Sequence, residues 1–256
     1  MSASYRKDRT IIVGLCKAPP NLSKEAFESK VGEFINTAVA LPASQKSNII
    51  KLEAIFQNRL LDEHLKSLGL PGATPGVCWI AELETDSNAV ELMQDPECAR
   101  LVREAEEFGY CTGTTIFSAD IVTKIEPDVP LSPDRNLTRG MAALKVPAHL
   151  SAEEFREKLE GIVDRFLALP IAEEKALKYS MYIPNENFST NFRALGFPAP
   201  EPVVVVILDT DTEQSLVEMT TDSTVKTLVA DAIRDLSIHL DSWIFSADVV
   251  TKIDNS

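Results

Sequence analysis

Apolar and polar residues follow two different periods along this chain, and these periods predict its secondary structure. Short stretches rich in β-branched and apolar residues indicate strands at residues 10–17, 48–56, 77–83 and 114–126. Apolar residues recur at helical spacing between the first two strands, and a second helical pattern precedes the last strand. The first half of the chain is therefore predicted to follow the order β-α-β-β-α-β, a ferredoxin-like unit.

Both predicted helices have recognisable first turns. Ser23 is the expected N-cap of the first helix, which should end near Pro42 because proline interrupts a helix. Asp95 is the expected cap of the second helix, with Pro96 at its first position. The buried face of the first helix is predicted from its apolar residues, which are Phe27, Val31, Phe34, Ile35 and Ala38.

The second half of the chain repeats the first. Residues 116–126 (IFSADIVTKIE) return 128 residues later as residues 244–254 (IFSADVVTKID), with nine of eleven positions identical. We predict two domains, 1–128 and 140–256, joined by a proline-containing linker at 129–139. In the second domain, strands are predicted at 140–146, 177–183, 203–209 and 242–254, and helices at 151–169 and 225–236.

The duplication also predicts how the two units pack. Both helices of each unit should cover one face of its sheet, which leaves the other face partly apolar and uncovered. A soluble protein avoids such a surface, and two units can cover each other. The predicted fold is α+β: two tandem ferredoxin-like βαββαβ repeats packed sheet to sheet as an α/β barrel within one chain. Because the barrel closes inside the chain, the protein is expected to be a monomer with a central cavity.

Composition and charge narrow the range of partners. The chain is 45% hydrophobic and 25% charged, which is typical of a soluble globular protein. Its net charge of −14 disfavours nucleic acid and anionic membrane surfaces. The longest apolar run, residues 203–208, is too short to cross a membrane, and the first nine residues lack the apolar core of a secretory signal.

Four cysteines lie in the first half and none in the second. They are Cys16, Cys78, Cys98 and Cys111. No CxxC pair occurs, and structural disulfides in only one of two similar copies would be unusual. Free thiols in a reducing compartment are therefore expected, which indicates a cytoplasmic protein.

Several short motifs resemble those of a known family. In each half, a lysine ends the first strand (Lys17, Lys145), Leu-Ser-x-Glu-x-Phe opens the helix, and Ala-Leu-Pro ends it. Together with the Asp-Pro-Glu entry at 95–97 and the aromatic closing strand, they resemble the dimeric α/β-barrel superfamily. The similarity is greatest to its EthD-like branch, present here in tandem over almost the whole chain. The resemblance implies a ferredoxin-like barrel.

The same resemblance suggests a range of activities. The superfamily includes cofactor-free cyclases, monooxygenases, isomerases and dehydratases, some haem enzymes, and stress-induced proteins. The EthD-like pattern usually has a histidine on the first helix, about eight residues after the helix phenylalanine. Ile35 and Val163 occupy those positions here. A reaction that depends on that imidazole is therefore not expected.

The closing strand of each half supplies candidate catalytic residues. Strand side chains alternate between two faces, so Phe117 is expected to face the helices, and Ser118 and Asp120 to face the barrel. The second copy would place Ser246 and Asp248 likewise. A carboxylate partly removed from water has a raised pKa, which suits general acid–base catalysis. Asp120 and Asp248 are thus the predicted catalytic residues, unless both are hydrogen-bonded and hold the two halves together.

Other residues are candidates for ligand contact. Lys17 and Lys145 are expected to bind an anionic group, or else to lie in solvent. The predicted ligand contacts further include Trp79, Ser118, Tyr179, Tyr182, Trp243 and Ser246. For the aromatic residues, core packing is an equally good interpretation.

No metal or cofactor is predicted. The three histidines, His64, His149 and His239, lack the spacing of metal ligands, and neither a phosphate-binding glycine loop nor a nucleophile motif occurs.

Two functions remain open. The first is a cofactor-free enzyme, of the cyclase, isomerase or lyase type, acting on a small hydrophobic or aromatic metabolite in the central barrel cavity. The second is a non-catalytic, stress-related or ligand-binding barrel for hydrophobic small molecules. Residues 57–76 and 185–202 differ most between the copies, and one of these segments is expected to cover a binding site.

Overall fold

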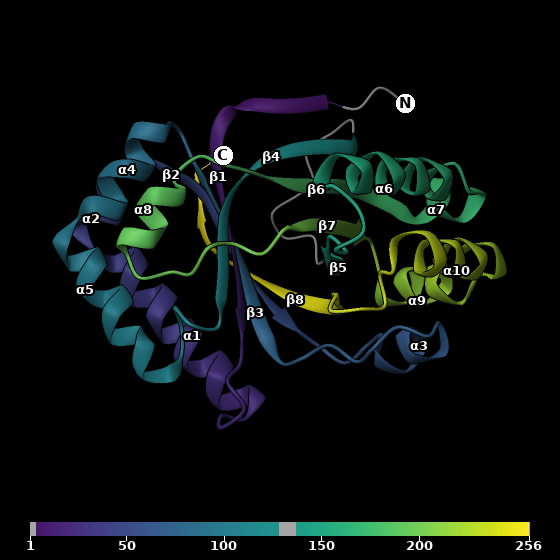
Figure 1. Ribbon diagram of the computed structural model, residues 1–256, viewed down its shortest axis with the longest axis horizontal. Helices are drawn as coiled ribbons and strands as arrows, with labels where there is room; N and C mark the ends of the chain where they lie inside the picture. The colour runs from purple at the N-terminus through teal and green to yellow at the C-terminus, as the bar shows by residue number, and fades with distance from the viewer. Residues whose placement is uncertain (1–3, 128–136, 256) are drawn as a thin grey trace.

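The computed structural model describes residues 4–127 and 137–255 (Figure 1). The first repeat consists of β1 (Ser4–Lys17), α1 (Lys24–Ala40), α2 (Pro42–Lys46), β2 (Ile49–Gln57), α3 (Asp62–Ser67), β3 (Gly76–Leu83), α4 (Asp86–Gln94), α5 (Pro96–Ala105), the 3₁₀ helix η1 (Glu106–Phe108) and β4 (Thr114–Ile125). The second consists of β5 (Thr138–Lys145), α6 (Ala152–Leu167), α7 (Pro170–Lys175), β6 (Ala176–Asn185), α8 (Ser189–Ala194), β7 (Val203–Thr210), α9 (Glu213–Thr221), α10 (Ser223–Leu236) and β8 (Trp243–Asp254). Residues 129–136 of the predicted linker lie outside the described residues.

The helices begin where side chains can cap them. Ser23 accepts a hydrogen bond from the backbone of Ala26 at the start of α1, and Asp95 caps α5, as the sequence predicts. The sequence pattern did not predict α4 and α9. Each of them has a threonine N-cap, Thr85 and Thr212, whose hydroxyl accepts a backbone hydrogen bond.

The eight strands form one closed antiparallel barrel, in the order β1-β3-β2-β8-β5-β7-β6-β4. Within it, each repeat contributes a four-stranded ferredoxin-like sheet, β4-β1-β3-β2 and β8-β5-β7-β6. Two strand pairs join the repeats, β2 with β8 and β4 with β6. The predicted α+β fold, a barrel of two tandem ferredoxin-like repeats within one chain, is confirmed.

The barrel interior is filled with apolar side chains. Phe117 and Phe245 are each 1% exposed and point inward, together with Val13 and Val205. The spaces at the two ends of the barrel measure only about 60 and 20 Å³. The central cavity expected from the sequence is therefore reduced to these two small spaces in the described part of the barrel.

The predicted orientation of the closing strands is wrong. Phe117 faces the barrel interior, whereas Ser118 and Asp120 lie on the outer face. Both faces of β4 are largely buried, one in the barrel and one under helices, so alternation did not reveal which face was which. On the outer face of β4, Ile116 packs in the core of the first repeat and Val122 in that of the second. Ser118 and Asp120 lie where the strand passes from one helical layer to the other.

Each repeat also contributes a short helix to the other's helical layer. α3 packs against α9 and β8 of the second repeat, and α8 packs against α4 and β4 of the first. Figure 1 shows α8 on the side of α1, α2, α4 and α5, and α3 on the opposite side with α9 and α10. Leu65 of α3 and Phe192 of α8 are buried in the core of the other repeat.

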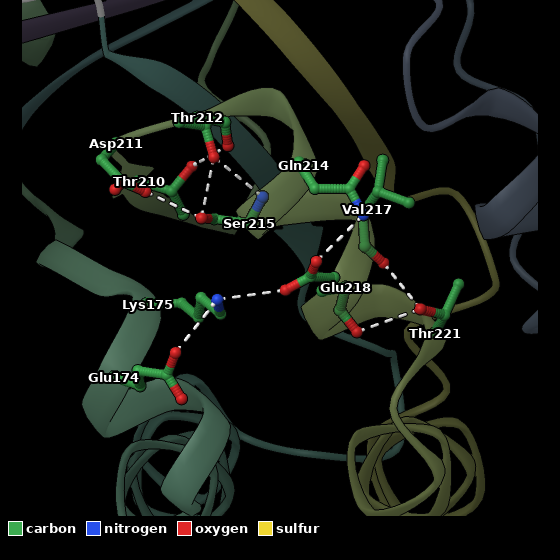
Figure 2. A network of polar contacts seen from close by, with 10 residues as sticks. All are labelled: Glu174, Lys175, Thr210, Asp211, Thr212, Gln214, Ser215, Val217, Glu218 and Thr221. Atoms are coloured by element: carbon green, nitrogen blue, oxygen red, sulfur yellow. Dashed lines mark hydrogen bonds and ion pairs between the residues drawn. The ribbon is translucent and has the colours of Figure 1, made fainter.

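A surface network of polar contacts joins α7 to α9 in the second repeat (Figure 2). Lys175 pairs with Glu174 and Glu218, both at 3.1 Å, and the Glu218 carboxylate also accepts a hydrogen bond from Gln214. Ser215 bonds to Thr212 at the start of α9. These contacts span an exposed surface, where ion pairs contribute little to stability.

Two further features concern the chain as a whole. Among the described residues, no helix is both long and apolar enough to cross a membrane. All four cysteines are free; Cys16, Cys78 and Cys111 are buried, and Cys98 is partly exposed.

Candidate functional site

An apolar cavity of about 140 Å³ lies between the sheet and the helices of the first repeat. Its floor is the outer face of the sheet, where Ile12, Leu52 and Ala81 point away from the barrel. Helices α1, α4 and α5 form its walls, and α8 covers it from the second repeat. No charged side chain lines this cavity among the described residues, so it suits an apolar ligand.

Polar groups gather at one side of the cavity. Trp79 and Tyr110 line it, and the buried thiol of Cys16 lies beside both. The indole N–H of Trp79 is buried and makes no hydrogen bond of good geometry, although the Cys16 thiol and the Tyr110 hydroxyl lie close to it. A buried donor without an acceptor is costly, so a ligand acceptor there would be stabilising.

The ionisable groups beside the cavity remain neutral at ordinary pH. Burial raises the pKa of the Cys16 thiol to about 12, although polar contacts with Thr114, Trp79 and Tyr110 partly oppose the effect. Burial also raises the pKa of the Tyr110 hydroxyl well above its usual value. These groups can share protons in hydrogen bonds, but neither supplies a base for proton abstraction near pH 7.

A glycine creates room for the indole. A Cβ at Gly14 would collide with the ring of Trp79, which lies across β1 at that point. Gly14 and Trp79 are also paired in the register of β1 and β3. This close approach lets a large aromatic side chain lie flat against the sheet and form the cavity floor.

The second repeat has different residues at the equivalent positions. By strand register, Cys16 corresponds to Leu144, Trp79 to Val206 and Ala81 to Leu208. Gly14 likewise corresponds to Ala142. The second repeat thus has aliphatic side chains where the first has a thiol, an indole and a small residue.

The predicted catalytic aspartates lie away from this cavity, in two similar clusters between the repeats. Asn58, which follows β2, donates to Asp248 at 2.8 Å and accepts from Ser246 at 2.5 Å. Asn185 of β6 donates to Asp120 at 2.9 Å and also bonds to Ser118. The structural alternative considered for these aspartates, a hydrogen-bonded contact between halves, matches this geometry.

The other predicted ligand contacts are dispersed. Lys17, Lys145 and Trp243 surround the 20 Å³ space at one end of the barrel, where Lys145 lies 3.6 Å from Glu201. Tyr182 lines the 60 Å³ space at the opposite end. Tyr179 packs outside the barrel against Phe166 of α6. Of the predicted ligand contacts, Trp79 is the one that lines the apolar cavity. These side chains therefore do not form a single aromatic wall.

A buried ion cluster, which the sequence pattern did not predict, lies at the barrel end that Tyr182 lines. Arg139 bonds twice to Asp209, at 2.6 and 2.9 Å, and once to Glu53 at 2.8 Å. Lys51 pairs with Glu53 at 2.7 Å. In the sequence, Arg139 and Asp209 each border an apolar strand, and this could have marked them as candidates for a buried ion pair. Their pairing could not be predicted, because it depends on β5 and β7 being neighbours in the barrel.

No group of three or more potential metal-ligating side chains occurs within the described ranges.

Comparisons with known proteins identify the fold. No protein-family model matches the chain, and no curated protein matches it. Among solved structures, an anthrone oxidase-like protein matches with a TM-score of 0.62 at 8% identity, over 100% of this chain and 98% of that one. A putative monooxygenase from Fusobacterium nucleatum matches with a TM-score of 0.51 at 12% identity, over 97% and 94%. These likenesses show the fold of the chain, a ferredoxin-like α/β barrel.

Proposed function

We propose that this protein binds a small apolar or aromatic molecule in the cavity of its first repeat. The observation that carries the proposal is an apolar space of about 140 Å³ lined by Trp79, whose buried indole N–H makes no hydrogen bond of good geometry. Apolar cavities of about 150 Å³ in other proteins hold benzene. A single aromatic ring with one acceptor oxygen, positioned toward Trp79, would fill this space and satisfy that donor.

Binding without chemistry is better supported than a cyclase, isomerase or lyase reaction. Those reactions need a group that removes or delivers a proton, and no carboxylate or imidazole lines the cavity among the described residues. Ile35, at the position of the EthD-like helix histidine, is one of the lining residues. Asp120 and Asp248 are engaged with Asn185 and Asn58 instead.

A cofactor-free enzyme acting on an aromatic substrate is the second candidate function. The names of the two structural neighbours, an anthrone oxidase-like protein and a putative monooxygenase, suggest it. The specific observation that favours it is the pair Trp79 and Tyr110, whose N–H and O–H could stabilise negative charge developing on a substrate oxygen. Turnover of the bound aromatic molecule would distinguish this candidate from binding alone.

The binding proposal is tested with benzene and phenol as probes, by isothermal titration calorimetry. The parent protein should bind one molecule of either probe per chain. Ala81→Leu should abolish binding, because it places in the cavity the side chain that the second repeat has at Leu208. Leu208→Ala is the matched control and should leave the stoichiometry at one.

A second variant tests the role of the indole. Trp79→Phe removes the N–H. It should weaken phenol binding relative to benzene by about two- to tenfold, which is the usual contribution of one hydrogen bond. Binding of neither probe by the parent, or unchanged binding by Ala81→Leu, would refute the proposed site.

A further inference from the structure

Helix α8 belongs to the second repeat, yet it completes the cavity of the first. Phe192, Leu195 and Phe197 line the cavity, and the two phenylalanines are only 3% and 5% exposed. The ring of Phe197 meets that of Tyr110 edge-on, with centroids 5.9 Å apart. The side of the cavity away from the sheet is thus formed by a segment that comes from the other half of the chain.

Polar contacts hold the segment that carries α8 at its ends, and apolar packing alone holds it along its length. Before the helix, the Ser118 hydroxyl donates to the carbonyl of Asn187 at 2.6 Å. After it, the backbone N–H of Val146 donates to the carbonyl of Pro202 at 2.8 Å. Within the described structure, the side chains of α8 itself make no hydrogen bond or ion pair with the first repeat. Their contact with α4 and β4 is apolar.

Positive φ angles mark both ends of α8, and its C-terminal end is closed by backbone hydrogen bonds from Gly196 to Arg193 and from Phe197 to Phe192. Phe188, at the N-cap position, has φ +63°, and its side chain makes no cap hydrogen bond. Gly196, just beyond the helix, has φ +102°, a conformation that favours glycine. A helix of six residues depends on packing for its stability, because so short a helix is unstable alone.

We propose that α8 is a movable cover for the apolar cavity and that Phe192 and Phe197 set the size of the ligand. This inference rests on the binding function proposed above. With α8 in place, the cavity of about 140 Å³ accepts one aromatic ring. A two-ring molecule enters only if α8 moves outward about Phe188 and Gly196. The second repeat thereby determines the specificity of a site built on the first.

The chain contains a matched control helix. α3 is also six residues long, lies at the corresponding place in the first repeat, and is followed by Gly69 with φ +78°. Its residue Leu65 packs into the core of the second repeat, where aliphatic side chains replace the polar groups of the first cavity. Mutation of Leu65 should therefore alter stability without altering ligand choice.

The test compares the dissociation constants of benzene and naphthalene by calorimetry. Phe192→Ala removes a ring from the cover and should improve naphthalene relative to benzene by at least about tenfold. Phe192→Leu, which preserves more of the buried surface, should shift the ratio in the same direction by less. Leu65→Ala should leave the ratio at the parent value. An unchanged ratio in both Phe192 variants, or an equal change in Leu65→Ala, would overturn the proposal.

Native-state hydrogen exchange tests the movement without a ligand. The amides of Phe192 and Leu195, bonded within α8, should exchange through a local opening that is insensitive to low denaturant. The amides of Leu65 and Leu68 in α3 should exchange more slowly. If the α8 amides exchange only through global unfolding, the cover does not move. If neither probe binds the parent, the proposed function fails, whereas the exchange result still decides whether α8 opens.

Discussion

Glu53 provides a sharp test of the electrostatics at the charged end of the barrel. Its carboxylate lies 2.8 Å from Arg139 and 2.7 Å from Lys51, and its side chain is 12% exposed. Burial by itself would raise the pKa of Glu53. Arg139 and Lys51 outweigh that effect and lower the pKa from 4.5 to about 2. The Glu53 carboxylate therefore stays ionised down to a much lower pH in the folded protein than in the unfolded chain.

That difference in pKa corresponds to about 3 kcal/mol of folding free energy. Because the folded pKa is the lower one, the contribution is fully present above the unfolded value of 4.5. It is lost as the pH falls from about 5 to about 2, where the carboxyl group becomes protonated in the folded state too. Glu53→Gln should accordingly be about 3 kcal/mol less stable than the parent at pH 7, and nearly equal to it at pH 2.

Urea unfolding of the parent and of Glu53→Gln between pH 2 and pH 7 measures this difference directly. Arg139 keeps both bonds to Asp209 in the variant, so no unpaired buried charge complicates the comparison. Glu126→Gln is the control at the same barrel end, because that side chain is 57% exposed and lies 3.7 Å from Lys178. The control should change stability by less than about 0.5 kcal/mol. A Glu53→Gln deficit that does not shrink toward pH 2 would refute the reasoning.

Two further predictions concern the contact between the repeats. Asn58→Ala should lower stability by about 2–3 kcal/mol in urea melts, because it leaves the Ser246 hydroxyl, 1% exposed, without its acceptor. Asp120→Asn and Asp248→Asn should each cost about 1 kcal/mol or less, since the amide oxygen still accepts a hydrogen bond; equal losses for all three variants would contradict this. Light scattering should give one chain mass for the whole protein, and a dimer or aggregate for residues 1–128 expressed alone. A soluble monomeric half would contradict closure of the barrel within the chain.

The fold could be predicted from the sequence because its signals are local and duplicated. Strand patterns, helix caps at Ser23 and Asp95, and the repeat at 128 residues all agree with the observed β-α-β-β-α-β order. The uncovered sheet face then required two repeats to pack together. These are arguments about which surfaces must be buried, and such arguments hold even where individual side chains are misplaced.

The site could not be predicted in the same way. Its cavity depends on side chains from both repeats and on how closely they pack, which no periodicity in the sequence reports. Trp79 was recognised as a candidate ligand contact, but Cys16 and Tyr110 were not, because a buried thiol and a buried phenol resemble ordinary core residues. The prediction that Ser118 and Asp120 face the barrel interior failed because the strand is covered on both faces.

The comparison of the two repeats shows where function should be sought in a duplicated barrel. The Ser-x-Asp motif is identical in both copies because it performs the same task twice, joining the last strand of one repeat to an asparagine of the other. A binding site needs no second copy, and its residues are free to differ. Trp79 differs from its counterpart Val206, and Tyr110 differs from Ile238, 128 residues away. Identity between the repeats thus indicates architecture, and the differences indicate the candidate ligand site.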